Sequence, residues 1–144
     1  MKVNIKKIRK NATIPTRGSK YSAGYDLYSC LSEPVRIEAG KTAKIPTGLA
    51  MEIPPGYAGF IFARSGLSTK KGLAPANKVG VCDSDYRGEY IVALHNHGDE
   101  EVVVNHGERI AQLVVAPFLA VDFVEVETLS ETVRGDGGFG STGT

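Results

Sequence analysis

The sequence predicts an all-β fold, a jelly-roll-like β-barrel or sandwich of short strands with at most one short helix. Glycine (17 residues) and proline (7 residues) interrupt the chain every several residues. This spacing leaves room for strands of about four to eight residues but not for long helices. Between the breaks, apolar residues alternate with polar ones, a pattern typical of half-buried strands. A glycine-rich stretch at the C-terminal end predicts a flexible tail beyond this fold.

Alternation locates the strands in order along the chain. Val35 and Ile37 alternate with charged neighbours, and the odd-numbered positions of 43–53 would lie on one strand face. Those positions are Ala43, Ile45, Thr47, Leu49, Met51 and Ile53. Residues 90–94 are apolar throughout, so we expect both faces of that strand to be covered. Further β-rich runs lie at 101–104, 110–117 and 121–127, which makes about eight to ten strands.

The one helix that the sequence allows begins at Ser65 and ends at Gly72. Serine is a favourable N-cap, and glycine commonly ends a helix in the left-handed conformation. Exposed N–H groups at such a helix start, together with Arg64 and the Ser65 hydroxyl, would form an anion site. The same residues are equally explained by an ordinary helix start beside a solvated arginine.

The C-terminal residues 134–144 read RGDGGFGSTGT and contain five glycines and one large apolar side chain, Phe139. Nothing there can bury a core, so we divide the chain into a β jelly-roll at 1–133 and a mobile tail at 134–144. Ordering the tail would cost on the order of 10–20 kcal/mol of backbone entropy. Its Gly-x-Gly-x-x-Gly spacing is no dinucleotide fingerprint, since no helix follows. A plain flexible terminus and a phosphate-wrapping segment both remain open.

Charge and composition narrow the classes of partner. With 17 basic and 16 acidic residues in 144, the net charge of +1 gives no general attraction to nucleic acid. No run approaches the roughly 18–20 apolar residues of a membrane span, and no apolar signal core follows the basic start. Two cysteines, Cys30 and Cys82, make no disulfide framework and are expected to be small buried residues. We therefore expect a single-domain cytoplasmic protein with neither nucleic acid nor membrane as partner.

Several polar residues could carry chemistry. Asp83 and Asp85 could be a metal pair, the acceptors of a turn, or a catalytic base with a structural partner. His95 and His97 would share a strand face, but without a third ligand cluster they are interpreted as polar strand-end residues. Gln112 lies among apolar neighbours, so its amide must bond to backbone or to a ligand.

Taken in order, five segments closely resemble the motifs of trimeric deoxyuridine triphosphatases over nearly the whole chain. The segments are AGYDLYS at 23–29, ARSGLS at 63–68, GVCDSDYRGEY at 80–90, GERIAQL at 107–113 and RGDGGFGSTG at 134–143. The resemblance implies a jelly-roll homotrimer with active sites at its subunit interfaces. It also implies Mg²⁺-dependent hydrolysis of dUTP to dUMP and pyrophosphate, which keeps uracil out of DNA and supplies dUMP for dTMP synthesis.

The resemblance also implies a role for each matching residue. Asp83 would activate the attacking water, Tyr86 would lie under the deoxyribose, and Asp26 would contact Mg²⁺ through a metal-bound water. The uracil edge would be read at a hairpin and its return strand by Asn77, Val81, Cys82 and Ile91. The phosphates would be held by Arg64, Ser65, Gly66 and Gln112. The tail would cover the base with Phe139 and close over the triphosphate with Arg134, Gly140, Ser141 and Thr142.

Two alternative functions remain beside this one. Deoxycytidine triphosphate deaminases share the fold, but Arg64-Ser65-Gly66 and Asp83 resemble the triphosphatase pattern more closely. A nucleotide-binding regulatory protein with little turnover is the second alternative, which the intact motifs disfavour. Cys82 stands where the family usually has an aliphatic residue, and Asp136 adds a negative charge to the tail.

Overall fold

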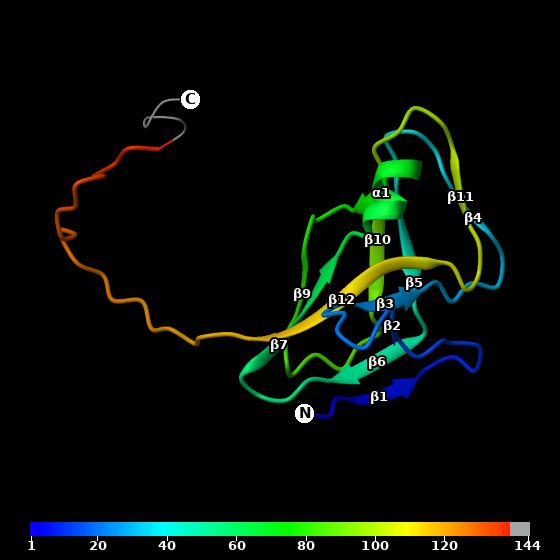
Figure 1. Cartoon of the computed structure of the whole chain (residues 1–144), viewed down its shortest axis with the longest axis horizontal. Coiled ribbons are helices and arrows are strands. Elements are labelled where there is room, and N and C mark those ends of the chain that lie inside the picture. Colours follow the sequence, from blue (N-terminus) through cyan, green and yellow to red (C-terminus); the bar gives the residue numbers. More distant parts are fainter. Residues whose placement is uncertain (139–144) are drawn as a thin grey trace.

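The computed structural model describes residues 1–138 and shows an antiparallel β fold with one short helix, which confirms the predicted all-β class (Figure 1). The described part holds twelve strand segments and one helix. In chain order these are β1 (Asn4–Lys7), β2 (Thr16–Arg17), β3 (Tyr25–Tyr28), β4 (Val35–Ile37), β5 (Thr42–Pro46), β6 (Leu49–Glu52), β7 (Tyr57–Phe62), α1 (Ser65–Lys71), β8 (Leu73–Pro75), β9 (Gly80–Cys82), β10 (Ile91–Asn96), β11 (Val102–Val104) and β12 (Arg109–Pro117).

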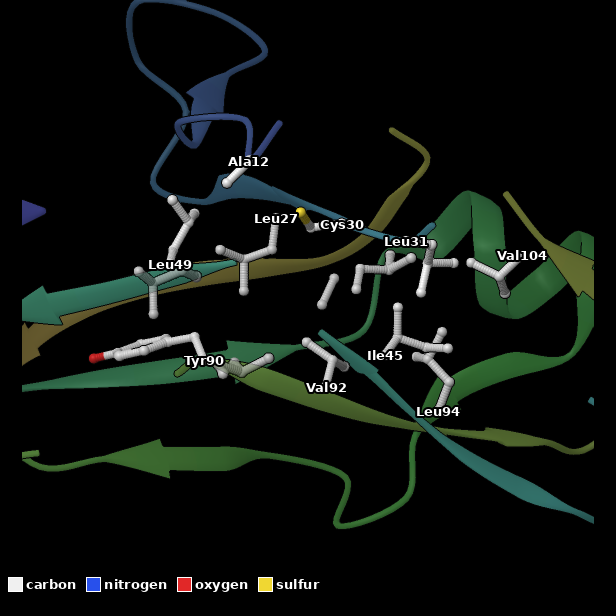
Figure 2. Packing of buried hydrophobic residues seen from close by; sticks show 14 of the residues in the cluster. Ala12, Leu27, Cys30, Leu31, Ile45, Leu49, Tyr90, Val92, Leu94 and Val104 are labelled. Atoms are coloured by element: carbon white, nitrogen blue, oxygen red, sulfur yellow. The ribbon is translucent and has the colours of Figure 1, made fainter. Parts of the chain in front are cut away.

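The strands form a five-stranded sheet and three smaller ones. The large sheet has the order β2-β3-β12-β7-β9, and a three-stranded sheet has the order β5-β10-β8. The remaining pairs are β1 with β6 and β4 with β11. Apolar residues from the facing sheets pack together in one core, which includes Leu27, Ile45, Leu49, Val92 and Leu94 (Figure 2). This arrangement places β9 at an edge of the large sheet, where it borders one of the sites described below.

The odd-numbered side chains of 43–53, predicted to share one face, are buried except for the partly buried Ala43, but the segment forms two strands instead of one. β5 pairs with β10, whereas β6 pairs with β1. The chain turns between them at Gly48, which has a φ of +69°. A Cβ there would lie 2.9 Å from both the Ala12 Cβ and the Cys30 Sγ. Only glycine fits both the backbone conformation and the space, so the strand breaks at this residue.

Three other local predictions need correction. Ser65 is the first helical residue instead of the N-cap, which is Arg64 with extended backbone and no side-chain capping bond. The helix does end at Gly72, whose φ is +65°. Ile91 in β10 is 45% exposed, so one face of that strand is not fully covered within the chain. The uracil-reading hairpin is not a paired hairpin, because β8 pairs with β10 while β9 pairs with β7.

The strand expected at 121–127 does not form. The last strand ends at Pro117, and the chain beyond it runs away from the packed sheets (Figure 1). Its apolar side chains are largely exposed, including Phe123 at 95% and Leu129 at 87%. A strand needs a neighbour to accept its backbone hydrogen bonds, and residues 1–138 provide none for this segment. No helix in the described residues combines the length and apolarity needed to traverse a bilayer.

Candidate functional site

A groove over the outer face of the large sheet is built around one carboxylate. We call it the arginine groove; Gly24, Asp26, Arg64, Gln112 and Arg109 are among its lining residues. The Asp26 side chain is only 14% exposed and lies between two guanidinium groups. Arg64 donates from Nε to Asp26 Oδ1 at 2.7 Å, and Arg109 donates from Nη1 to Oδ2 at 3.3 Å. Each carboxylate oxygen therefore has its own positive partner.

Strand register brings these residues onto one face. Gln112 in β12 is the Cα partner of both Asp26 in β3 and Phe62 in β7, so their three side chains point to the same side. The Gln112 amide donates from Nε2 to the Ala63 carbonyl at 2.8 Å, which confirms that it is hydrogen-bonded, here to backbone. A Cβ at Gly24 would overlap the Gln112 side chain, with 3.2 Å to Cδ and less to Oε1. Glycine at 24 therefore allows Gln112 to lie across β3.

Helix α1 begins beside this groove. Ser65 and Gly66, both exposed, form its first turn and line the groove with Arg64. Lys78 also lines the groove, from a turn where its φ is +64°. Three positively charged side chains, from Arg64, Lys78 and Arg109, therefore border a single, partly buried carboxylate. The excess of positive charge suits a ligand that carries several negative charges.

A second, smaller cavity of about 260 Å³ lies at the β9 edge, and we call it the edge pocket. Its lining includes the six residues predicted to contact the nucleoside or the reacting water: Asn77, Val81, Cys82, Asp83, Tyr86 and Ile91. Asp83 directly follows β9, is exposed, and makes no side-chain hydrogen bond or ion pair within residues 1–138. Its backbone carbonyl accepts from Tyr86 N–H at 3.2 Å and so forms the turn between the two side chains.

The Tyr86 ring is held by its own loop. Its hydroxyl donates to the Glu89 carbonyl at 3.1 Å, and its ring lies 6.0 Å from that of Tyr90. A Cβ at Gly88 would lie 2.6 Å from the Tyr86 Cζ, so only glycine lets the ring fold back over the loop. The Glu89 carboxylate accepts from Gly48 N–H at 2.8 Å, which ties the loop to the core. Tyr86 therefore presents a ring face with a fixed position.

The alternatives left open for the acidic pair and the histidines can be compared with the structure. Neither Asp83 nor Asp85 accepts a side-chain hydrogen bond in the described part, so they are not the acceptors of an Asx turn here. No cluster of three or more potential metal ligands forms among residues 1–138. His95 bonds through Nδ1 to the Thr42 hydroxyl at 2.8 Å, and its ring lies 4.4 Å from that of His97. His97 has a lowered pKa, by desolvation first and then by Lys78 and His95.

The two cysteines are both free thiols. Cys30 is buried in the core as predicted, and burial raises its pKa. Cys82 is only half-buried, because it sits at the edge pocket. Burial also raises the pKa of Cys82, and a polar contact from the Tyr90 hydroxyl offsets part of that increase.

The arginine groove and the edge pocket are separate cavities, and no residue in the described part lines both of them. Phe62 points into the groove beside Gln112, whereas Ile61, the preceding residue of β7, borders the edge pocket. Consecutive side chains of a strand point to opposite faces, so β7 contributes Phe62 to one site and Ile61 to the other from its two faces. The predicted residues thus form two groups in one chain. They do not form a single pocket.

The predicted tail residues contribute to neither pocket in the described part. Arg134 donates from Nε to the Gly137 carbonyl at 2.8 Å, within the segment that runs away from the sheets (Figure 1). Phe139, Gly140, Ser141 and Thr142 lie outside the described residues.

Arg109 and Lys78 are the site residues that sequence reasoning missed. A β-bulge between Arg109 and Ala111 shifts the register against β3, so simple alternation does not assign Arg109 to the Gln112 face. Its place in the GERIAQL segment was the available signal. Lys78 lies in a turn, where alternation carries no information.

Comparison with known proteins gives consistent matches over the full length. The profile of the family described as dUTPase matches residues 10–143. The chain is 51% identical over 146 residues to the deoxyuridine 5'-triphosphate nucleotidohydrolase of Desulfitobacterium hafniense, covering 99% of this chain and 97% of the relative. It is 46% identical over 143 residues to that of a Hydrogenobaculum species, covering 99% of each.

Solved structures agree with the sequence relatives. The Staphylococcus bacteriophage 80alpha dUTPase with dUpNHpp superposes with a TM-score of 0.90 at 32% identity, covering 99% of each chain. A mutant dUTPase from phage phi11 of S. aureus, described with a structural Mg(II) ion, superposes with a TM-score of 0.82 at 27% identity, covering 91% of this chain and 100% of the phage chain.

Proposed function

The chain belongs to the dUTPase family and is a dUTP diphosphatase, and we propose that it hydrolyses dUTP at a composite site formed by the edge pocket and the arginine groove. The products are dUMP and pyrophosphate, so the reaction lowers the dUTP available for incorporation into DNA and supplies dUMP. The observation that carries the site assignment is the edge pocket itself. It gathers Asp83 with the five side chains or backbone segments expected around the nucleoside.

Asp83 is the general base of this proposal. Its carboxylate is exposed at the pocket rim and has no hydrogen-bond or ion-pair partner in the described part, so its lone pairs are free to accept a proton from water. A positioned base of this kind contributes typically about 10²–10⁴-fold to the rate. The water then attacks the α-phosphorus, and pyrophosphate leaves.

The edge position of β9 supports uracil recognition by backbone groups. β9 pairs with β7 on one side only, so the backbone N–H and C=O groups on its other edge have no sheet partner. A fixed set of backbone donors and acceptors distinguishes uracil from cytosine by hydrogen-bond polarity. Asn77 and Ile91 close the pocket from the neighbouring turn and from β10. The Tyr86 ring face is available to the deoxyribose.

The arginine groove is suited to the triphosphate. Arg64, Ser65, Gly66 and Gln112 offer a guanidinium, a hydroxyl and N–H donors, and phosphoryl transfer depends mainly on such positioning and charge neutralisation. Lys78 and Arg109 extend the positive charge. The tail, with Arg134, Phe139, Gly140, Ser141 and Thr142, is proposed to close over base and phosphates as a lid.

The groove fits a hydrated Mg²⁺ held mainly by substrate phosphates. Both Asp26 oxygens already accept from arginines, yet each keeps a lone pair that can accept from a metal-bound water. Mg²⁺ retains several waters when phosphates bind it, so a cage of carboxylates is unnecessary. Mg²⁺, when bound, neutralises charge on the triphosphate. Asp26 would orient its hydration shell without ligating it directly.

The separation of the two sites supports a homotrimer with active sites at subunit interfaces. Because the expected nucleoside contacts and phosphate contacts line separate cavities within one chain, the edge pocket of one copy is proposed to meet the arginine groove of another. The exposed apolar side chains of 118–133 provide surface that association would bury. Homo-oligomers with closed symmetry satisfy all such contacts at once.

The direct test of function is pyrophosphate release from dUTP, dCTP, dTTP and UTP, each with and without Mg²⁺. We expect release from dUTP alone, and only with Mg²⁺. Ammonia release from dCTP would instead indicate a deaminase, and tight dUTP binding without turnover would indicate a regulatory protein.

A further inference from the structure

The side chain of Tyr90 ends in a buried hydroxyl without a partner. Tyr90 is 1% exposed, and its backbone groups are fully used: N–H donates to the Leu49 carbonyl at 2.8 Å, and C=O accepts from the Thr47 hydroxyl at 2.6 Å. Among the buried side-chain polar atoms of residues 1–138, only the Tyr90 hydroxyl lacks a hydrogen bond. Folded proteins rarely leave such a group unpaired, because its desolvation is not compensated.

This hydroxyl lies beside Cys82, at the edge pocket. Figure 2 shows the ring packed with Leu49 and Leu27, with the oxygen at the outer end of the cluster and pointing away from Val92 and Leu94. Tyr90 lines the edge pocket together with Cys82, Asp83 and Tyr86. Burial, and then the adjacent Cys82 thiol, raise the pKa of Tyr90, so the hydroxyl keeps its proton and remains a donor.

The neighbouring groups offer this hydroxyl no strong acceptor. The Tyr86 hydroxyl is already bonded to the Glu89 carbonyl at 3.1 Å. The Glu89 carboxylate accepts from Gly48 N–H at 2.8 Å and lies 3.5 Å from Arg9. The Cys82 thiol is nearby, but sulfur is a weak acceptor. A ligand or water in the pocket would provide a stronger acceptor than this thiol.

We propose that Tyr90 is a positioning residue for the nucleotide, whose hydroxyl donates a hydrogen bond to the nucleoside part of the substrate, directly or through one retained water. This rests on the proposed function, which places the nucleoside in the edge pocket. A hydroxyl left unpaired in the free protein is paired in the complex, so the bond favours binding without stabilising the free fold. Tyr90 therefore increases the affinity for the substrate through its hydroxyl, beside the Cys82–Asp83 segment.

The test is Tyr90→Phe, which removes only the oxygen. Loss of one neutral hydrogen bond in the complex predicts a 2- to 10-fold rise, roughly, in KM for dUTP and in the Kd of dUMP. kcat should change less than KM, and the unfolding midpoint should stay equal or increase, because an unpaired buried hydroxyl is lost. The matched control is Tyr57→Phe, at a tyrosine that lines neither pocket, with KM and Kd as in the parent protein.

A spectroscopic readout separates positioning from packing. With ¹³Cζ-labelled tyrosine, the resonance that disappears in Tyr90→Phe should shift when dUMP is added to the parent protein. Unchanged KM and Kd in Tyr90→Phe would overturn the proposal, and so would a Tyr90 resonance that does not shift when dUMP is added. In either case, dUTP hydrolysis by the parent protein would leave the proposed function intact. A lower unfolding midpoint with unchanged affinity also overturns it, since that result indicates a purely structural hydroxyl. A parent protein that neither hydrolyses dUTP nor binds dUMP refutes both.

Discussion

Replacing Asp83 by asparagine isolates the proton-accepting role of one carboxylate. The side chain is exposed and has no partner within residues 1–138, so the isosteric change should alter folding stability by less than about 0.5 kcal/mol. An amide keeps the shape and hydrogen-bonding capacity but cannot take the proton from water. We expect kcat to fall by about 10²–10⁴-fold. The affinity for the analogue dUpNHpp should change by less than about 3-fold, because the nucleoside contacts remain.

The assay is continuous pyrophosphate release at saturating dUTP, with analogue affinity measured by calorimetry. The matched control is Asp85→Asn, which removes the same charge two residues away, from a side chain that does not line the edge pocket. Its kcat should stay within about twofold of the parent, because screening weakens the influence of an exposed charge outside the pocket. Near-normal turnover in Asp83→Asn would refute the base assignment. Equal losses in both variants would show that the turn's overall charge matters instead of one positioned carboxylate.

Three further changes test other parts of the site. Deleting 134–144 should leave far-ultraviolet circular dichroism and oligomeric state unchanged, since among residues 1–138 the Arg134 side chain bonds only to Gly137. The deletion should reduce kcat/KM at least about 10-fold because the proposed lid is lost, and an unfolded product would contradict the tail's independence. Tyr86→Ala should lower the dUTP/UTP ratio of kcat/KM by about 10-fold, and an unchanged ratio would argue against sugar contact. Gly24→Ala should displace Gln112 and lower kcat/KM by about 10-fold or more, so full activity would show that the Gln112 position is unimportant.

The strand faces could be predicted from the sequence better than the strand connections. Alternation over 43–53 correctly identified the buried side chains, because burial depends on the period of the strand. It could not show the break at Gly48, which follows from the close approach of Ala12 and Cys30, residues distant in the sequence. Gly72 ended the helix as predicted, since its left-handed conformation is a local property. The predicted N-cap, Ser65, lies one residue after the observed N-cap, Arg64.

The expected strand at 121–127 shows that the sequence of one chain does not predict whether a strand finds a pairing partner. Its composition is typical of a strand, but pairing depends on a neighbour that the described residues do not offer. The sequence likewise identified the motif residues without indicating that they line two separate cavities. That Asp26 lies between Arg64 and Arg109 depends on the bulge in β12, which leaves no periodic signal. Sequence order therefore grouped the motif residues but did not indicate that they line two separate cavities.

The central claim is that Asp83 and Arg64 of one active site come from different copies of the chain. Mixing equal amounts of Asp83→Asn and Arg64→Ala chains, each nearly inactive alone, and letting the trimers reassemble tests it directly. In random trimers, each mixed assembly regains one intact site, which predicts recovery of about a quarter of the parent activity. Activity that stays at the level of the two separate variants would show that a single chain supplies both residues and would contradict the account.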